Sequence, residues 1–428
     1  MGFRKSQFLE EEKTGIPIQI KRNTIYLAIT QALIATGFQL VPSLGGLIML
    51  RFTEVLALIA MTLSIGRITG PLMSYPAGYL ADKRGRKAVL FFGMGLCATG
   101  SLLIYYSITA STLIGFISGL VIYGLGLGAL GQITVAALDM YPRRLKAEGM
   151  GYVMTGTSLG SIGSPLLVWA ASNYAASHGL DELAIPWLVP PMLMVVTAAL
   201  VYMIKPDPLD IARNISEHYP NEPVVKKKLV GEEIEVGGLI KMFPVQIALV
   251  NNALGFAVML MVMSLSSLIM RQNGYSITMI SASIGLHVFG MFGFSSVFGR
   301  MADRMGRKKM MYIGSIVLGI SGLLTPLTSE YWIITIGLFF VGLGWSANNV
   351  ATVAMLGDST PPTTMGKMMG VNQLIGGASS LFLPALGGYL AQNYGFPTVG
   401  VASMILSIPI LLLAIRLREP SPGTYDHT

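Results

Sequence analysis

The sequence is poor in charged residues, in histidine and in cysteine. Asp, Glu, Lys and Arg make up 12% of its 428 residues, against about 25% in an ordinary soluble domain. One cysteine, Cys97, excludes an internal disulfide and a metal cluster held by thiolates. Four histidines leave little material for a paired base and nucleophile, and no glycine-rich loop followed by Lys-Ser or Lys-Thr is present to hold ATP. We therefore expect neither an enzyme nor a bound cofactor.

Apolar residues dominate what is there. Hydrophobic side chains make up 53% of the chain and the mean hydropathy is +0.63, which predicts a multi-pass membrane protein. The formal net charge of +8 is spread over short loops rather than gathered on one face, so no nucleic-acid partner is expected. Residues 1–23 are charged and lack an apolar core, so we expect no cleavable signal peptide there.

Twelve apolar runs are long enough to cross a bilayer, and they form two sets of six. They lie near 24–46, 53–76, 89–108, 111–137, 150–172, 186–204, 243–270, 278–298, 309–327, 331–356, 368–391 and 396–416. We expect an all-α membrane protein with twelve transmembrane helices in two pseudo-symmetric six-helix bundles. The expected divisions are a cytoplasmic segment at 1–23, bundles at 24–204 and 243–416, a polar cytoplasmic linker at 205–242 and a cytoplasmic tail at 417–428.

A ten-residue motif occurs once in each half. Residues 78–87 and 299–308 are identical at six of ten positions and lie 221 residues apart. Each copy falls between the second and third apolar run of its half, which indicates a tight basic turn at the membrane surface. The second glycine of the motif permits a sharp change of chain direction.

The charged residues of the motif have predictable partners. Asp82 lies at the carboxyl end of a helix, where the helix dipole disfavours an anion, so a cation or the amino-terminal end of another helix should stabilise it. After the turn, Arg86 can reach Asp139 at the end of the fourth run. The second copy offers the same pairing, of Arg307 with Asp358.

The basic residues also predict the orientation. With the amino terminus in the cytoplasm, every Lys and Arg falls on that side except Arg51, Arg67 and Arg271. By the positive-inside rule we expect a protein of the cytoplasmic membrane with both termini, and both motif turns, on the cytoplasmic side.

At these positions the chain resembles the major facilitator superfamily, whose signature loop between helices 2 and 3 has this pattern of Gly, Asp, Gly and basic residues. The resemblance covers nearly the whole chain. It implies a secondary transporter that moves a small solute by alternating access with ion or proton coupling, and it names helix 11 as the partner of Asp82. The motif residues would latch the halves together on the cytoplasmic side. The implied conformational gate comprises Gly78, Asp82, Gly85, Arg86, Asp139, Gly299, Asp303, Gly306, Arg307 and Asp358.

Helix 5 resembles, in part, the motif of the superfamily's antiporters. The matching residues are Gly151, Gly160 and Pro165, while the closing Gly387-Gly388 pair occurs after Pro384 in helix 11. Small residues at this spacing let helices approach closely, which is also a purely structural role.

Two basic side chains lie near the middle of apolar runs, Arg67 in helix 2 and His287 in helix 8. In the repeat the two occupy nearly equivalent places. Charged residues at this depth are costly and usually mark a pathway. An anionic group bound between them and a coupling proton on His287 are two hypotheses; a third is that backbone carbonyls or hydroxyls satisfy both side chains.

The resemblance further implies that helices 1, 4, 7 and 10 line a central cavity. Their polar and aromatic residues include Gln31, Gln39, Gln132, Asn251, Asn252, Trp345, Asn348 and Asn349. Neutral amides beside an aromatic ring suit an organic solute held by hydrogen bonds and stacking. The predicted substrate site consists of Gln31, Arg67, Gln132, Asn251, Asn252, His287, Trp345, Asn348 and Asn349. The bilayer and this small solute are the expected partners of a monomeric chain.

Copper import is one alternative. Met259 and Met263 on helix 7, and His287 and Met291 on helix 8, are pairs at i, i+4 spacing whose thioether and imidazole groups suit Cu(I). The pattern resembles the CcoA-type copper importers and their riboflavin-transporting relatives, as does the run 342–345. Copper importers also use cysteines, and this chain has one. We therefore prefer a vitamin, metabolite or drug as the solute and keep Cu(I) import and a non-transporting membrane sensor as alternatives.

Overall fold

A computed structural model describes residues 16–142, 145–219, 236–360 and 364–415. Within these ranges every regular element is helical, as expected where no water is available to satisfy backbone N–H and C=O groups. The first half contains α2 (Ile18–Phe38), the π-helix η1 (Val41–Gly45), α3 (Gly46–Met49), α4 (Leu56–Arg84), α5 (Arg86–Thr109), α6 (Leu113–Leu130), α7 (Gln132–Asp139), α8 (Lys146–Ser177), the 3-10 helix η3 (Ile185–Leu188) and α9 (Val189–Met203).

Three short helices follow, of which two come directly after α9. They are α10 (Pro208–Arg213), α11 (Ile215–His218) and α12 (Val236–Ile240). The second half contains α13 (Phe243–Gln272), α14 (Ile277–Gly293), α15 (Ser295–Met305), α16 (Arg307–Leu324), the 3-10 helix η4 (Thr325–Leu327), α17 (Tyr331–Ser359), α18 (Met365–Tyr394) and α19 (Pro397–Ile415). The α14 and α15 axes meet at an angle of 41°, so this span is broken.

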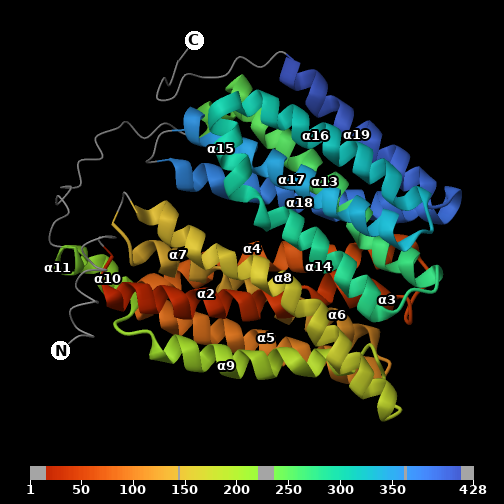
Figure 1. Cartoon of the computed structure of the whole chain (residues 1–428), viewed down its shortest axis with the longest axis horizontal. Helices are drawn as coiled ribbons and strands as arrows, with labels where there is room; N and C mark the ends of the chain where they lie inside the picture. Colours follow the sequence, from red (N-terminus) through yellow and green to blue (C-terminus); the bar gives the residue numbers. More distant parts are fainter. Residues whose placement is uncertain (1–15, 143–144, 220–235, 361–363, 416–428) are drawn as a thin grey trace.

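The two halves form two bundles that lie side by side (Figure 1). The first half runs from red to yellow-green in that view and the second from green to blue. They meet along two main seams, where α4 packs against α18 and α8 packs against α14. Each seam pairs one helix from each half, so the contact has the pseudo-symmetry expected of a duplicated six-helix unit.

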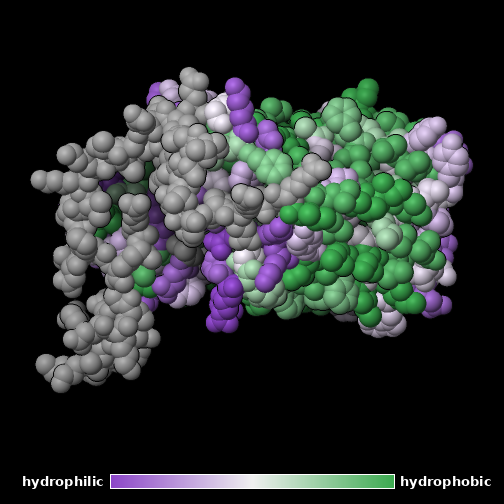
Figure 2. All heavy atoms as spheres, turned by 90° about the horizontal axis from the view of Figure 1, so that it is seen from above, coloured by the Kyte–Doolittle hydropathy of each residue, from purple (hydrophilic) through white to green (hydrophobic). Residues whose placement is uncertain are grey.

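The surface and the helix lengths are those of a multi-pass membrane protein. Among the described residues, nine helices are long and apolar enough to cross a bilayer, and the broken α14–α15 pair makes ten. Helices α8 and α19 occupy the two remaining predicted positions. Figure 2 shows a hydrophobic band on the visible face with hydrophilic side chains at both ends. Twelve spans in two bundles are consistent with these features, and the predicted fold class is confirmed.

The two copies of the motif form matching turns. Gly85 has φ 91° and Gly306 has φ 95°, a left-handed conformation that glycine adopts without a steric penalty. Each turn reverses the chain between two helices, α4 and α5 in the first half and α15 and α16 in the second. We call the end of the molecule with these turns the motif end, and the end with Arg51 the opposite end.

The halves pack more closely at the opposite end than at the motif end. There Gly388 of α18 lies directly against the backbone of Leu56 and Ala57 of α4, so that a Cβ at Gly388 would collide with them. The Leu56 N–H also donates to Gln392 Oε1 at 3.1 Å. Near the motif end of the same helix, Gly370 faces open space.

Candidate functional site

A cavity of about 1090 Å³ lies between the halves and extends toward the motif end. Its walls come from α4, α6, α13, α14 and α18, with smaller parts from the end of α2, from η1 and from α7. Most of the lining is apolar; its polar side chains are Arg67, Ser74, Tyr75, Tyr123 and Gln373. Among the described lining residues, Arg67 alone carries a charge at neutral pH. A mostly apolar cavity with a few polar groups is typical of a site for a small organic molecule.

Arg67 of α4 lies against Phe256 of α13, which belongs to the other half. The guanidinium carbon is 5.0 Å from the centroid of the ring. A cation–π contact is worth about 0.5–2 kcal/mol, whereas a charged side chain at the centre of a membrane helix costs about 2.5–3.5 kcal/mol. The Phe256 contact therefore offsets only part of the cost of placing this charge in the bundle.

Three aromatic residues of the second half form one wall of the cavity. Phe256 and Phe292 line it, and the buried Trp345 of α17 packs edge-to-face behind both, with ring centroids 5.1 Å and 6.1 Å away. Such contacts hold rings in defined orientations. The wall can therefore present two positioned phenyl groups to a planar solute.

Two amides of the first half that were predicted on the cavity-lining helices, Gln31 and Gln39, are engaged in helix packing. Gln31 Nε2 donates to Thr157 Oγ1 at 2.9 Å, and the buried Gln39 donates to the Gly160 carbonyl at 3.1 Å. The first bond joins α2 to α8, and the second joins Gln39, directly after α2, to the same helix. Gln132, at the start of α7, is partly buried and lies beside Gly78.

The amides of the second half are also used between helices. Asn251 Nδ2 donates to Thr352 Oγ1 at 2.8 Å, and Asn252 Nδ2 donates to the Asn372 carbonyl at 2.8 Å. Asn348 is buried beside them, and Asn349 is partly buried. Of the predicted substrate residues, Arg67 is the one that lines the cavity in this conformation, and solute binding by the others stays a prediction.

The structure brings two of the four predicted copper ligands to the cavity. Met263 and Met291 line it, while Met259 and His287 are buried in the bundle. The imidazole Nδ1 of His287 donates to the Leu338 carbonyl at 2.7 Å, since a carbonyl can only accept. The described residues contain no group of three or more His, Cys, Asp or Glu placed to hold a metal.

The predicted ion pairs of both motif copies are present. Arg86 Nε donates to Asp139 Oδ2 at 2.6 Å, and its Nη1 donates to Asp82 Oδ1 at 2.8 Å. Asp82 is thus stabilised by a cation, as expected for an anion at the end of α4. Its side chain is nevertheless 69% exposed. In this conformation its described partner is Arg86 rather than α18.

The second motif copy has nearly the same geometry. Arg307 Nε donates to Asp358 Oδ2 at 2.8 Å and Nη2 lies 3.1 Å from Asp303 Oδ1. Asp303 is 71% exposed. Each turn therefore ties three helices of its own half together and leaves one carboxylate in solvent.

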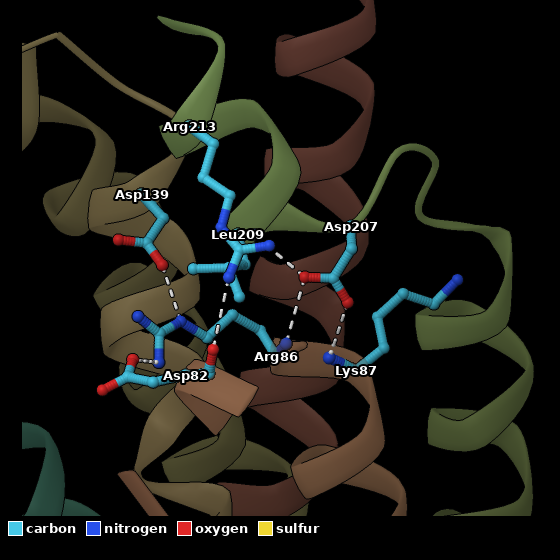
Figure 3. A network of polar contacts seen from close by, with 7 residues as sticks. All are labelled: Asp82, Arg86, Lys87, Asp139, Asp207, Leu209 and Arg213. Atoms are coloured by element: carbon cyan, nitrogen blue, oxygen red, sulfur yellow. Dashed lines mark hydrogen bonds and ion pairs between the residues drawn. The ribbon is translucent and has the colours of Figure 1, made fainter. Parts of the chain in front are cut away.

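A third carboxylate, Asp207, completes the first turn (Figure 3). Its Oδ1 accepts the backbone N–H of Arg86 at 3.0 Å and that of Leu209 at 2.9 Å. Its Oδ2 accepts the N–H of Lys87 at 3.0 Å. One carboxylate therefore caps the first turns of both α5 and α10, where the helix dipole favours a negative charge. The start of the expected linker is built into the motif turn.

Two other contacts strengthen this attachment. Lys87 Nζ donates to the Ile204 carbonyl at 2.8 Å. Figure 3 shows the other contact, in which Arg213 Nη2 lies 3.4 Å from the Asp82 carbonyl. In the second half Lys308 Nζ donates to the Ile415 carbonyl at 2.9 Å, which repeats the Lys87 contact. Residues 220–235 of the expected linker lie outside the described residues.

An ion pair joins two connections at the opposite end. Arg51 follows α3, and its guanidinium donates to both carboxylate oxygens of Asp181, which follows α8. Partial burial raises the pKa of Asp181. The hydrogen bond from Arg51 and the N–H groups of Leu183 and Ala184 outweigh burial and hold this pKa below its usual value. The pair is therefore formed at neutral pH.

Sequence reasoning found Trp345 of the aromatic wall but did not find Phe256, Phe292, Gln373 or the role of Asp207. Phe256 and Phe292 are two of 17 phenylalanines, and no spacing separates them from packing residues. Asp207 lies 121 positions from Arg86 in the chain. Its position after a Pro and before Pro208 could have indicated a helix cap, since proline is favoured at the first helical position.

Comparisons with known proteins agree with this architecture. The family model of the Major Facilitator Superfamily matches residues 11–243 and 247–427. The uncharacterized MFS-type transporter YdeG of Bacillus subtilis is 26% identical over 93% of this chain and 92% of its own length. The riboflavin transporter RfnT of Brucella anthropi is 24% identical over 93% and 96%. A mutant peptide transporter POT solved with sulfate matches with a TM-score of 0.70 at 16% identity, covering 94% of this chain and 96% of that one.

Proposed function

The chain belongs to the Major Facilitator Superfamily and is a membrane transporter of small solutes, not an enzyme, and from this premise we propose that its solute is a planar organic molecule of the flavin class. The observation that carries the proposal is the aromatic wall of the cavity, with Phe256 and Phe292 facing the space and Trp345 behind them. Hydroxyl and amide groups of Tyr123 and Gln373 can bind the polar edge of such a solute. The similarity to a riboflavin transporter supports the same class.

The two ends of the molecule support transport by alternating access. The seam between α4 and α18 is closed at Gly388 and open at Gly370, so the cavity communicates with the motif end. We infer from the positive-inside rule that this end, with its basic turns, lies on the cytoplasmic side. The conformation is then inward-facing, and the exposure of Asp82 and Asp303 follows because the latch between the halves is released.

Copper import stays the second candidate because Met263 and Met291 both line the cavity. Two thioethers can bind Cu(I), but the cation Arg67 lines the same space and would repel the ion. A Cu(I) competition titration of the purified protein decides this point. Copper affinity that is unchanged by the double variant Met263→Leu and Met291→Leu ends the alternative.

Riboflavin counterflow in proteoliposomes tests the flavin proposal. We expect exchange by the wild type and a loss of about tenfold in apparent affinity for Phe256→Leu, since an aromatic contact is worth about 0.5–1.5 kcal/mol. Phe340→Leu on α17 is the matched control, because Phe340 is an exposed aromatic that does not line the cavity. Absence of any flavin binding or exchange by folded wild-type protein would overturn the proposal.

A further inference from the structure

The charge of Arg67 lacks an anion. Arg67 lines the cavity, and its described contact is with the face of the Phe256 ring. Every ion pair described in the chain uses other residues, and no Asp or Glu of the described ranges pairs with Arg67. Arginine stays protonated at any physiological pH. The cavity therefore contains a fixed positive charge whose counter-ion must come from elsewhere.

The groups around Arg67 cannot supply that counter-ion. The other polar side chains of the lining are the neutral Ser74, Tyr75, Tyr123 and Gln373. His287 is close enough to interact electrostatically with Arg67, but its Nδ1–H is bound to the Leu338 carbonyl and the imidazole is never an anion. An anion that enters the cavity would meet Arg67 as its one cationic partner among the described lining residues.

The position of the guanidinium suits an anion attached to a ring. Its face is occupied by Phe256 of the other half, so the N–H groups at its edge remain available for a bidentate pair with a carboxylate or phosphate. Phe292 lies on the same wall as Phe256. A solute with a planar ring and one negative group could place its ring against this wall and its charge at Arg67.

We propose that Arg67 is the anion-binding residue of the cavity and that the solute is an aromatic organic anion bearing a carboxylate or phosphate. The inference rests on the proposed function, because it assumes that this cavity is the transport site. It adds the charge of the solute, which the aromatic wall alone does not specify.

Matched ligands that differ in charge test the proposal. Binding of riboflavin and of riboflavin 5′-phosphate is measured by Trp fluorescence on the whole purified protein in lipid-free uncharged detergent, where no lipid headgroup supplies an anion. We expect the phosphate ester to bind at least about tenfold more tightly, as for a charge-assisted pair, and its affinity to fall with added NaCl. Arg67→Gln should lower the affinity for the phosphate ester by at least about tenfold and so remove its advantage over riboflavin.

Two further variants keep the result interpretable. Arg67→Lys retains a charge but not the planar fork, so it should keep part of the preference even if Arg67→Gln folds poorly. Arg51→Gln removes a cation at the opposite end, outside the cavity, and should leave the affinities for both flavins unchanged. Equal affinities for the two flavins, or equal losses for both in Arg67→Gln, would overturn the proposal. So would inorganic phosphate that binds as tightly as the ester, because the ring would then be irrelevant.

A second ligand pair separates this inference from the flavin proposal. Phenylacetate and phenylacetamide share a ring and differ in charge. If neither flavin binds but phenylacetate is preferred through Arg67, the flavin class is wrong and the anion site stands. If both flavins bind without a preference, the flavin class stands and the anion site is wrong.

Discussion

The Asp207 carboxylate accepts the backbone N–H of Arg86, the residue whose side chain pairs with Asp82 and Asp139. The segment that leaves the first bundle is therefore fastened to the turn that carries the motif charges. A shift of this segment would act directly on the backbone that positions Arg86.

Asp207→Ala should destabilise the first half. It leaves the N–H groups of Arg86 and Lys87 without their described acceptor, and loss of a helix cap costs about 0.5–2 kcal/mol. We expect a lower melting temperature in detergent, with Asp207→Asn intermediate. Asp210→Ala is the control, since Asp210 is an exposed carboxylate of the same helix. Equal melting temperatures for Asp207→Ala and the wild type would contradict the capping role.

Asp82→Asn should slow transport without unfolding the protein. The carboxylate is 69% exposed, and exposed ion pairs contribute about 0–1 kcal/mol, so the melting temperature should change little. If Asp82 latches the halves in the other conformation, the transport rate in proteoliposomes should fall several-fold. An unchanged rate at equal protein density would remove the latch hypothesis.

Gly388→Val should open the opposite end. The added side chain collides with the backbone of Leu56 and Ala57, so the closed seam cannot form. Spin labels at Glu54→Cys and Asn393→Cys, with the buried Cys97 unlabelled, should move apart. Gly370→Val, which meets open space, should leave this distance as in the wild type. A distance unaffected by Gly388→Val would show that the seam does not close there.

The Arg51–Asp181 pair should stabilise the protein only above acidic pH. The folded-state pKa of Asp181 is lowered, mainly because the bonds from Arg51 and the loop N–H groups outweigh partial burial. Its contribution is present above the unfolded value and is lost as the pH falls through the folded one. Asp181→Asn should therefore lower the melting temperature at pH 7, by an effect of at most about 1 kcal/mol, and the difference should shrink below about pH 4. A difference that persists at low pH would assign the effect to packing.

The sequence predicted the motif contacts well because their chemistry is repeated and directional. The pairs Arg86–Asp139 and Arg307–Asp358 could be foreseen since each basic residue follows a turn of known length. Arg67 could be singled out as a lone charge in an apolar run. The contacts of the amides were harder to predict. Asn251 and Asn252 lie on the predicted helix, but the rotation of that helix about its axis decides which of its side chains face the cavity. In a chain whose helices are apolar on all sides, periodicity gives no information about that rotation.

The break between α14 and α15 gives the second half a joint at the cavity wall. Phe292 lies on one side of the break and the turn with Arg307 on the other, whereas in the first half α4 runs unbroken from beside Arg67 to Arg84. A movement at the cavity can thus reach the first turn along one continuous helix, which contains Pro71 and Pro76, but must cross the break to reach the second. The two halves then transmit such a movement differently. The same substitution at Arg86 and at Arg307 should therefore change transport to different extents.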